Sequence, residues 1–270
     1  MRKIGLIVAV EEEAMRQKYG EGYDLNDGYC TVLYQTAKSQ VYALYSGAGE
    51  IFAAAATQYL IDRYEVAAVL NYGVVGGCRE DLMADEPCLV DCVVHWQYDL
   101  SDVDGVPVGQ YMEYYPDRRL QTDERLMEMA SRVFPNLRHV CCASGDKFMG
   151  KAEEKLWLHR EFGADVCDME AAAILLTCDR NDVPCLMVKT VADSVRGGAA
   201  EYWNEKGRTA MTCLDIVDKR MEEMKVKTPP EGSRPQALRL FFVFSKPIGG
   251  QYNGVFYGPR SDVPQVPERC

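Results

Sequence analysis

Residues 165–193 have the sequence DVCDMEAAAILLTCDRNDVPCLMVKTVAD, and they decide the fold class. A short apolar lead-in ends at Asp168-Met169-Glu170, and the Ala-, Ile- and Leu-rich run after it predicts a helix that ends near Asn181. The apolar run from Cys185 to Val191 is typical of a buried strand, and it stops at Ala192-Asp193. One carboxylate therefore marks a helix start and another marks a strand end. Open α/β sheets bind ligands at the carboxyl ends of their strands. Carboxylates at those two places are suited to holding sugar hydroxyls and transferring a proton.

Alternation of strand-like and helix-like segments extends this pattern from Lys3 to Val191 and predicts an α/β fold with a parallel or mixed sheet. The 270 residues are 47% hydrophobic, which is enough for one large domain with a sizeable core. We assign that domain to residues 1–225. Residues 226–270 are rich in Gly and Pro and too short for a second domain, so we expect an appended, loosely ordered tail.

Composition excludes several function classes. A net charge of −11 argues against non-specific nucleic-acid binding, which needs a basic face. No window approaches the ~18 consecutive apolar residues of a membrane span, and the apolar run after Met1 is interpreted as a first strand rather than a signal peptide. The 11 cysteines form no C-x-x-C pair and lack a histidine at metal spacing. We therefore expect a cytoplasmic protein with reduced core cysteines, no metal and no membrane partner.

Two glycine-rich segments follow predicted strands. Ser46-Gly47-Ala48-Gly49 leads into an Ala-rich helix from about Ile51 to Arg63, which places backbone N–H groups where they suit a hydroxyl or an anion. Tyr72 to Gly77, sequence YGVVGG, follows the strand 66–71 and does not match the dinucleotide fingerprint. The first segment is also explained as a turn that only closes a tight bend. Phe148 comes just after the strand 140–143, where it is suited to stacking on a flat base or to ordinary core packing.

Six segments together resemble one family. In chain order they are KIGLIVAVEEEA (3–14), SGAGEIFAAAAT (46–57), VLNYGVVGGC (69–78), ASGDKFM (143–149), ADVCDMEAAAI (164–174) and VPCLMVKTVADS (183–194). They resemble the 5′-methylthioadenosine/S-adenosylhomocysteine nucleosidases of the purine nucleoside phosphorylase superfamily, over about residues 3–225. The resemblance implies a three-layer α/β/α fold with a central mixed, twisted sheet, and usually a homodimer. It implies cofactor-free hydrolysis of the N-glycosidic bond of adenosine thioethers, releasing adenine for methionine salvage.

The same resemblance implies roles for particular residues. Asp193 matches the general acid toward adenine N7, and Glu13 matches the carboxylate that activates the attacking water. Glu170, with Met169, matches the ribose clamp, while Phe148 and Met149 fall where the family holds adenine. These residue types suit the reaction, because the breaking bond leaves positive charge on the ribose and negative charge on the base. General acid–base help of this kind contributes typically ~10²–10⁴-fold.

The substrate-facing positions depart from the family. Lys189 stands where the family has an arginine, which keeps the charge but loses the planar fork. Ala192 and Val74 stand where it has serines, so two hydroxyls are missing. The polar segment 97–110, which we expect to lie over the site, carries three aspartates that do not suit a purely apolar methylthio pocket.

Three readings of the function follow. The first is the nucleosidase just described. The second is a phosphate-dependent purine nucleoside phosphorylase, which Glu13 disfavours because it would repel the phosphate dianion. The third is a non-catalytic nucleoside-binding relative, suggested by Lys189, Ala192 and Val74. Taken singly, each carboxylate is also explained as a cap or a solvated charge.

Overall fold

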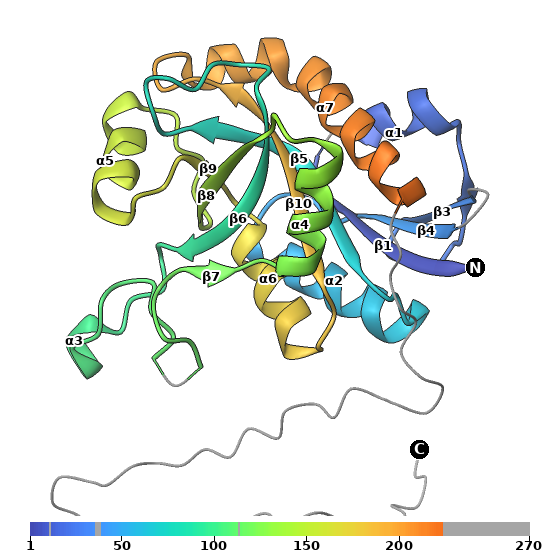
Figure 1. The fold of residues 1–270 in the computed structure, drawn as a ribbon, viewed down its shortest axis with the longest axis horizontal. Coiled ribbons are helices and arrows are strands. Elements are labelled where there is room, and N and C mark those ends of the chain that lie inside the picture. The colour runs from blue at the N-terminus through green and yellow to red at the C-terminus, as the bar shows by residue number, and fades with distance from the viewer. Residues whose placement is uncertain (11, 36–38, 113, 224–270) are drawn as a thin grey trace, which may run out of the picture. The chain divides into compact units, whose positions relative to one another are not determined.

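A computed structural model describes residues 1–223 apart from 11, 36–38 and 113 (Figure 1). The side chains of residues 12, 13, 104 and 211–223 lie outside this description, as does the whole predicted tail 226–270. The strands are β1 Arg2–Val8, β2 Tyr23–Asp24, β3 Thr31–Gln35, β4 Ser39–Tyr45, β5 Val69–Gly77, β6 Pro87–His95, β7 Leu120–Gln121, β8 Arg138–Ser144, β9 Val166–Asp168 and β10 Cys185–Asp193. The helices are α1 Glu12–Tyr19, α2 Glu50–Tyr64, α3 Ser101–Asp104, α4 Glu124–Val133, α5 Ala152–Phe162, α6 Ala171–Arg180 and α7 Gly198–Glu223.

The described strands form one mixed sheet of ten strands that partly closes on itself. Strand β5 pairs in parallel with β1 and β10, and β10 pairs antiparallel with β6. From β6 the pairing continues through β8 to β9, and β9 returns antiparallel to β5. The ring β5–β9–β8–β6–β10 therefore has no free edge at β5, and β1, β4, β3 and β2 extend outward from it (Figure 1).

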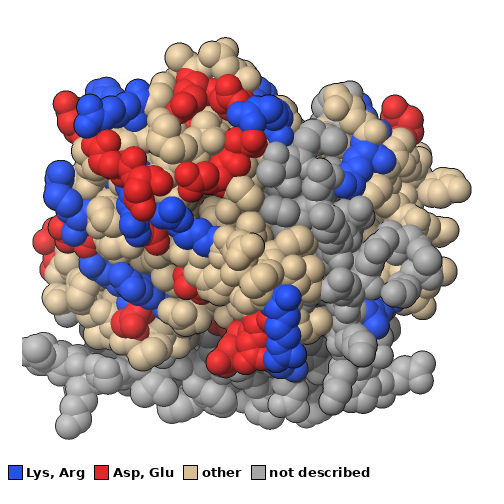
Figure 2. All heavy atoms as spheres, turned by 45° about the horizontal axis from the view of Figure 1, so that its top comes forward, with Lys and Arg blue, Asp and Glu red and all other residues tan. Residues whose placement is uncertain are grey.

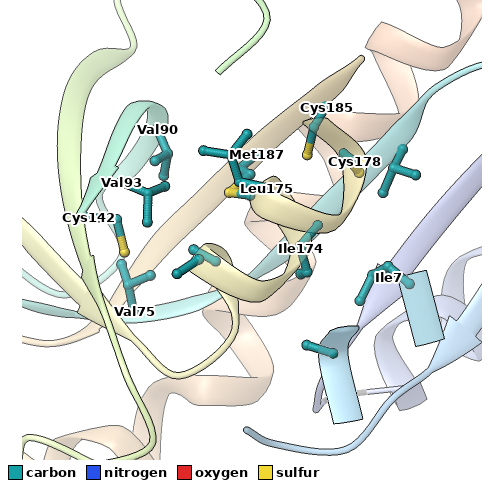
Figure 3. Close-up of a cluster of buried hydrophobic side chains, with 14 of the residues drawn as sticks. Ile7, Val75, Val90, Val93, Cys142, Ile174, Leu175, Cys178, Cys185 and Met187 are labelled. Atoms are coloured by element: carbon teal, nitrogen blue, oxygen red, sulfur yellow. The ribbon is translucent and has the colours of Figure 1, made fainter. Parts of the chain in front are cut away.

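Helices cover both faces of this sheet. One buried cluster joins the sheet to α1, α4 and α7 through residues such as Met15, Leu126 and Ala210. A second joins the other face to α2 and α6 through residues such as Ala53 and Ile174. Figure 3 shows α6 within this second cluster, with side chains of the neighbouring strands around it. The predicted three-layer α/β/α architecture with a mixed sheet is confirmed.

A third, smaller cluster packs α5 onto β8 and β9. On the face drawn in Figure 2, Lys and Arg side chains alternate with Asp and Glu, and neither sign dominates. None of the described helices is both long enough and apolar enough to cross a membrane.

Most predicted elements are confirmed, and two boundaries are wrong. The strand predicted over residues 66–71 begins at Val69 and continues to Gly77, because its glycines leave room for side chains from neighbouring elements. The charged amphipathic pattern from Asn204 to Lys225 predicts a long last helix, and that helix begins six residues earlier, at Gly198. The amphipathic pattern of residues 122–133 predicts a helix capped by Thr122 or Asp123, and the structure has Asp123 as the N-cap, whose side chain accepts a hydrogen bond from the Leu126 amide.

The segment 97–110 contains the short helix α3 and extends away from the sheet (Figure 1). Only its beginning reaches the expected region, where the Gln97 amide oxygen lies 2.7 Å from the position that a Cβ on Gly145 would occupy. Most of this segment therefore does not cover the carboxyl ends of the strands. A stacked pair of rings holds it instead, with the centroids of Tyr98 and Tyr111 3.8 Å apart.

Candidate active site

The N-termini of α2 and α6 meet beside the ends of β8 and β9, and carboxylates from elsewhere in the chain cap both helices. The Glu50 amide donates to Asp146 Oδ1 at 2.7 Å, and the Gly49 amide donates to Glu170 Oε1 at 2.9 Å. In return, the Ala173 amide donates to Glu50 Oε2 at 2.5 Å. Such amides have no partner within their own helix, and the helix dipole favours negative charge there. The convergence concentrates carboxyl groups in one place.

A buried ion pair crosses strand β5 next to these helix starts. Lys189 Nζ on β10 lies 2.9 Å from Asp168 Oδ2 on β9, and the two side chains are 2% and 1% exposed. The pair passes over Gly73, where a Cβ would lie 3.5 Å from Lys189 Nζ and any larger side chain would displace it. Asp168 Oδ1 also accepts hydrogen bonds from the amides of Glu170 and Ala171 at 3.3 and 3.2 Å.

Charge and burial give three neighbouring carboxyls, those of Asp168, Glu170 and Glu50, different pKa values. Burial acts to raise the pKa of Asp168, but the Lys189 ammonium, together with hydrogen bonds from Ser144 and the Ala171 amide, holds that pKa below its ordinary value. Burial raises the pKa of Glu170 to about 7, with the Asp168 charge adding to the effect. The pKa of Glu50 is raised to about 8, mainly by burial and further by Asp168, against the hydrogen bond from Ser144. Two carboxyls that carry a proton near neutrality thus adjoin one that stays ionised.

Asp193 is the last residue of β10, which pairs with β5 on the side opposite β9. It lies opposite Gly76, whose other neighbour is Cys167 on β9, so the two flanking strands are about 10 Å apart at this point. Its residue surface is 1% exposed. Its carboxylate Oδ2 forms an ion pair with Lys155 of α5, a residue with no exposed surface. Burial raises the pKa of Asp193, and the Lys155 ammonium opposes that rise.

The structure brings some of the predicted residues together. Glu170 and Lys189 belong to one network through Asp168, and Met169 lies between β9 and α6 with its side chain partly buried. Ala48 is exposed in the turn that precedes Gly49. Glu13 lies in the first turn of α1, and its side chain is outside the described residues.

The other predicted residues lie around this network. Phe148 is 43% exposed and meets Tyr202 of α7 edge to face, with the ring centroids 5.4 Å apart. Met149 is buried in the cluster beneath α5. Val74 is partly buried and packs against the cluster on the α1, α4 and α7 side of the sheet.

Sequence reasoning missed Glu50, Asp168 and Lys155 as site residues. In the sequence, Glu50 looks like an ordinary acidic residue at a helix start, and no feature marks it as part of a site. Lys155 had one: with Leu158 and Phe162 it occupies an i, i+3, i+7 stripe, and that stripe is the buried face of α5. A lysine on the core face of an amphipathic helix needs a partner, and the structure supplies Asp193.

The chain resembles known proteins over most of its described length. The family model described as "Phosphorylase superfamily" matches residues 3–223. The 5′-methylthioadenosine/S-adenosylhomocysteine nucleosidase of Hydrogenovibrio crunogenus is 30% identical over 203 residues, which are 71% of this chain and 85% of that protein. The aminodeoxyfutalosine nucleosidase of Campylobacter jejuni is 27% identical over 213 residues, 75% of this chain and 90% of that protein.

The fold is also that of solved structures. A 5′-methylthioadenosine/S-adenosylhomocysteine nucleosidase from Helicobacter pylori superimposes with a TM-score of 0.77 at 24% identity, covering 83% of this chain and 99% of that one. The resemblance seen in the sequence is therefore confirmed. The chain belongs to the phosphorylase superfamily, among its nucleosidases, a family of enzymes that hydrolyse N-glycosidic bonds.

Proposed function

We propose that this protein hydrolyses the N-glycosidic bond of a 5′-substituted adenosine, with 5′-methylthioadenosine and S-adenosylhomocysteine as first candidates, and releases adenine. The observation that carries this proposal is the set of buried carboxyls at one end of the sheet, namely Glu50, Asp168, Glu170 and Asp193. Their protonation states differ, which is what a reaction needing an acid and an anion requires.

In the proposed reaction Asp193 is the acid, Glu13 is the base and Glu170 binds the ribose. As the bond between C1′ and N9 breaks, its electron pair leaves with adenine, and Asp193 gives a proton to N7. A water oxygen then bonds to C1′, and Glu13 takes the water proton. The Gly49 amide holds Glu170 Oε1, which leaves Glu170 Oε2 to accept hydrogen bonds from the ribose hydroxyls. Glu170 thus anchors the ring while the bond stretches.

The charges favour water over phosphate as the nucleophile. Among the described residues of the site, the two buried cations, Lys155 and Lys189, are each already paired with a carboxylate. A phosphate dianion would enter a cluster of carboxyls with no unpaired buried cation to receive it, and isolated buried charge is costly. This supports hydrolysis rather than phosphorolysis.

The names of the relatives contain three substrates, so three candidates for the 5′ group follow from them. Some are named for methylthioadenosine and adenosylhomocysteine and others for aminodeoxyfutalosine. A panel of 5′-methylthioadenosine, S-adenosylhomocysteine, aminodeoxyfutalosine and adenosine, each assayed for free adenine with and without phosphate, separates them. We expect phosphate-independent adenine release from at least one of the first three compounds.

An Asp193→Asn variant tests the acid directly. We expect it to lose about 10²–10⁴-fold in kcat, because the amide cannot give up a proton. Asp62→Asn is the matched control, since Asp62 lies exposed on α2, and it should keep wild-type activity. The proposal is wrong if no compound yields adenine, or if product forms only with phosphate and contains ribose 1-phosphate.

We also infer a homodimer, as the family resemblance implies. Ile51 and Phe52 follow directly after Glu50 on α2 and are 77% and 62% exposed, so two large apolar side chains face outward beside the site. Light scattering on the purified protein should give twice the chain mass, and Ile51→Asp/Phe52→Asp should give the chain mass.

A further inference from the structure

Lys155 is a charged residue at a core position, where an apolar side chain is usual. It has no exposed surface, and it shares the buried face of α5 with Leu158 and Phe162. A lysine in such a position is rarely tolerated unless its ammonium group is fully paired. Nothing in the reaction described above uses it.

The ammonium group of Lys155 is fully paired, and its partners are concentrated at the end of β10. It forms an ion pair with Asp193 Oδ2 and donates to the Ser194 carbonyl at 2.8 Å and to the Asp193 carbonyl at 3.3 Å. Three acceptors match the three donors of an ammonium group. Among the described residues, the contact made by the Asp193 carboxyl engages Oδ2, and Oδ1 is not used in it.

Strand β5 makes room for this contact. A Cβ on Gly76 would lie 3.3 Å from Lys155 Cε, 3.4 Å from Lys155 Nζ and 3.1 Å from Cys167 Sγ. Any side chain at position 76 would therefore press on the lysine. The second glycine of the G-V-V-G-G run has a physical purpose that is separate from substrate contact.

We propose that Lys155 is a positioning residue for Asp193: it fixes one carboxyl oxygen and stabilises the anion that remains after the other has given its proton to the leaving base. This inference rests on the proposed function. Lys155 keeps all three of its protons throughout. The proton that adenine N7 gains comes from Asp193 Oδ1, the carboxyl becomes an anion, and the neighbouring ammonium lowers the free energy of that anion.

A purely structural role is the competing explanation, because Lys155 also ties Ser194 to α5. The two explanations differ in what they predict for pH dependence. The groups that face the Asp193 carboxyl are Lys155 from α5 and Glu201 from α7, and the Cys78 thiol lies close enough to Lys155 to feel its charge. Glu201 Oε2 is itself held by the Ser194 amide at 2.5 Å and the Ser194 hydroxyl at 2.8 Å.

Removing the Lys155 charge should raise the pKa of Asp193 further. Burial and Glu201 already raise that pKa, and Lys155 is the group that opposes them. Activity is lost at alkaline pH when Asp193 gives up its proton, so this alkaline limb should move to higher pH in a neutral variant. At the same time kcat should fall, because the anion formed in the reaction loses its counter-charge. A merely structural lysine would lower the amount of folded enzyme without moving the limb.

The test compares Lys155→Met, Lys155→Gln and Lys155→Arg with the control Lys151→Met, whose lysine is exposed at the start of α5. Purified variants are assayed for kcat and KM from about pH 5 to pH 10, using the panel compound that wild type cleaves. We expect both neutral variants to lose about 10²-fold in kcat with little change in KM and to shift the alkaline limb upward by about one pH unit. Lys155→Arg should return the limb toward wild type, and Lys151→Met should change neither quantity.

The glutamine variant guards against failure to fold, because its amide can still donate to the Ser194 carbonyl. A folded Lys155→Gln enzyme with an unmoved alkaline limb would overturn the proposal. A second readout does not depend on turnover: the Asp193 carboxyl is titrated by ¹³C NMR, assigned by its loss in Asp193→Asn. If wild type is inactive but the Asp193 carboxyl titrates at a higher pH in Lys155→Gln than in wild type, the proposed function is refuted and the pairing of Lys155 with Asp193 stands. Equal titration in both proteins would refute the pairing.

Discussion

Replacing Lys189 by methionine should destabilise the protein strongly, and the structure sets the size of the effect. Lys189 and Asp168 are 2.9 Å apart and only 2% and 1% exposed, so solvent screens them little. Breaking such a pair from one side costs about 3–5 kcal/mol, because it leaves the other charge buried and unpaired. Asp168 keeps its two backbone hydrogen bonds from Glu170 and Ala171, so we expect a value near the lower end, about 3 kcal/mol.

Urea unfolding followed by circular dichroism measures this loss. Arg132→Met is the matched control, since Arg132 and Glu128 form a 3.2 Å pair whose side chains are 77% and 57% exposed. That exposed pair should contribute no more than about 0.5 kcal/mol. The double variant Lys189→Met/Asp168→Asn removes the stranded charge and should recover at least about 1 kcal/mol relative to Lys189→Met alone.

The sign of the pH dependence gives a further check. Lys189 lowers the folded-state pKa of Asp168, so its contribution is present above the unfolded pKa of an aspartate and is lost as the pH falls through the folded value. Without Lys189, burial would raise the Asp168 pKa instead, and the carboxyl would take up a proton as the pH falls. The gap in stability between wild type and Lys189→Met should therefore begin to narrow above the ordinary aspartate pKa of about 4, where the variant's Asp168 takes up its proton, and narrow further below it, where wild type loses the contribution of the pair. A loss under about 1 kcal/mol at pH 7, or a double variant weaker than Lys189→Met, would refute the reasoning.

Two further predictions concern the convergent helix starts. The folded-state pKa of Glu50 is raised to about 8, so the folded state holds a proton that the unfolded state releases. Wild-type stability should therefore fall as the pH rises from about 5 to 8. Glu50→Gln should flatten this dependence in urea unfolding, and an unchanged slope would contradict the assignment. Gly49→Ala should cost more than Gly20→Ala although both have positive φ (108° and 75°), because a Cβ at 49 lies 3.0 Å from Asp146 Oδ1 while position 20 is open. The strain they share is about 1–2 kcal/mol, and equal thermal shifts would show that Asp146 moves freely.

The sequence predicts the order of elements well where apolar runs and caps agree. Residues 165–193 form β9, α6 and β10 as expected, because the apolar run 185–191 is buried along its length and Asn181 ends the helix. Asp123 caps α4 as its position suggests. Such features depend on neighbours a few residues away, so one sequence contains the information needed to find them.

The glycines of β5 show where that information runs out. In the sequence, Gly73 and Gly76 read equally well as a turn, because turns and close approaches both need a residue without a side chain. The pairing of β5 with β10 brings Lys189 close to Gly73, and α5 brings Lys155 close to Gly76, so both lysines need the space. Those partners come from distant parts of the chain, and no local pattern brings them to β5.

Both buried lysines reach carboxylates beside β5, and this links the candidate acid to the rest of the site. Lys189 reaches Asp168 over Gly73, and Lys155 reaches Asp193 beside Gly76. A larger residue at either glycine would push a lysine from its carboxylate without touching the carboxylate itself. The pKa of Glu170 depends on Asp168 and Lys189, and the pKa of Asp193 depends on Lys155. Strand β5 therefore influences the protonation of both carboxyls, although it supplies no titratable side chain to either ion pair. When a carboxylate site is sought in a sequence of this kind, the spacing of small residues on the central strand and a lysine on a core-facing helix stripe are as informative as the acids.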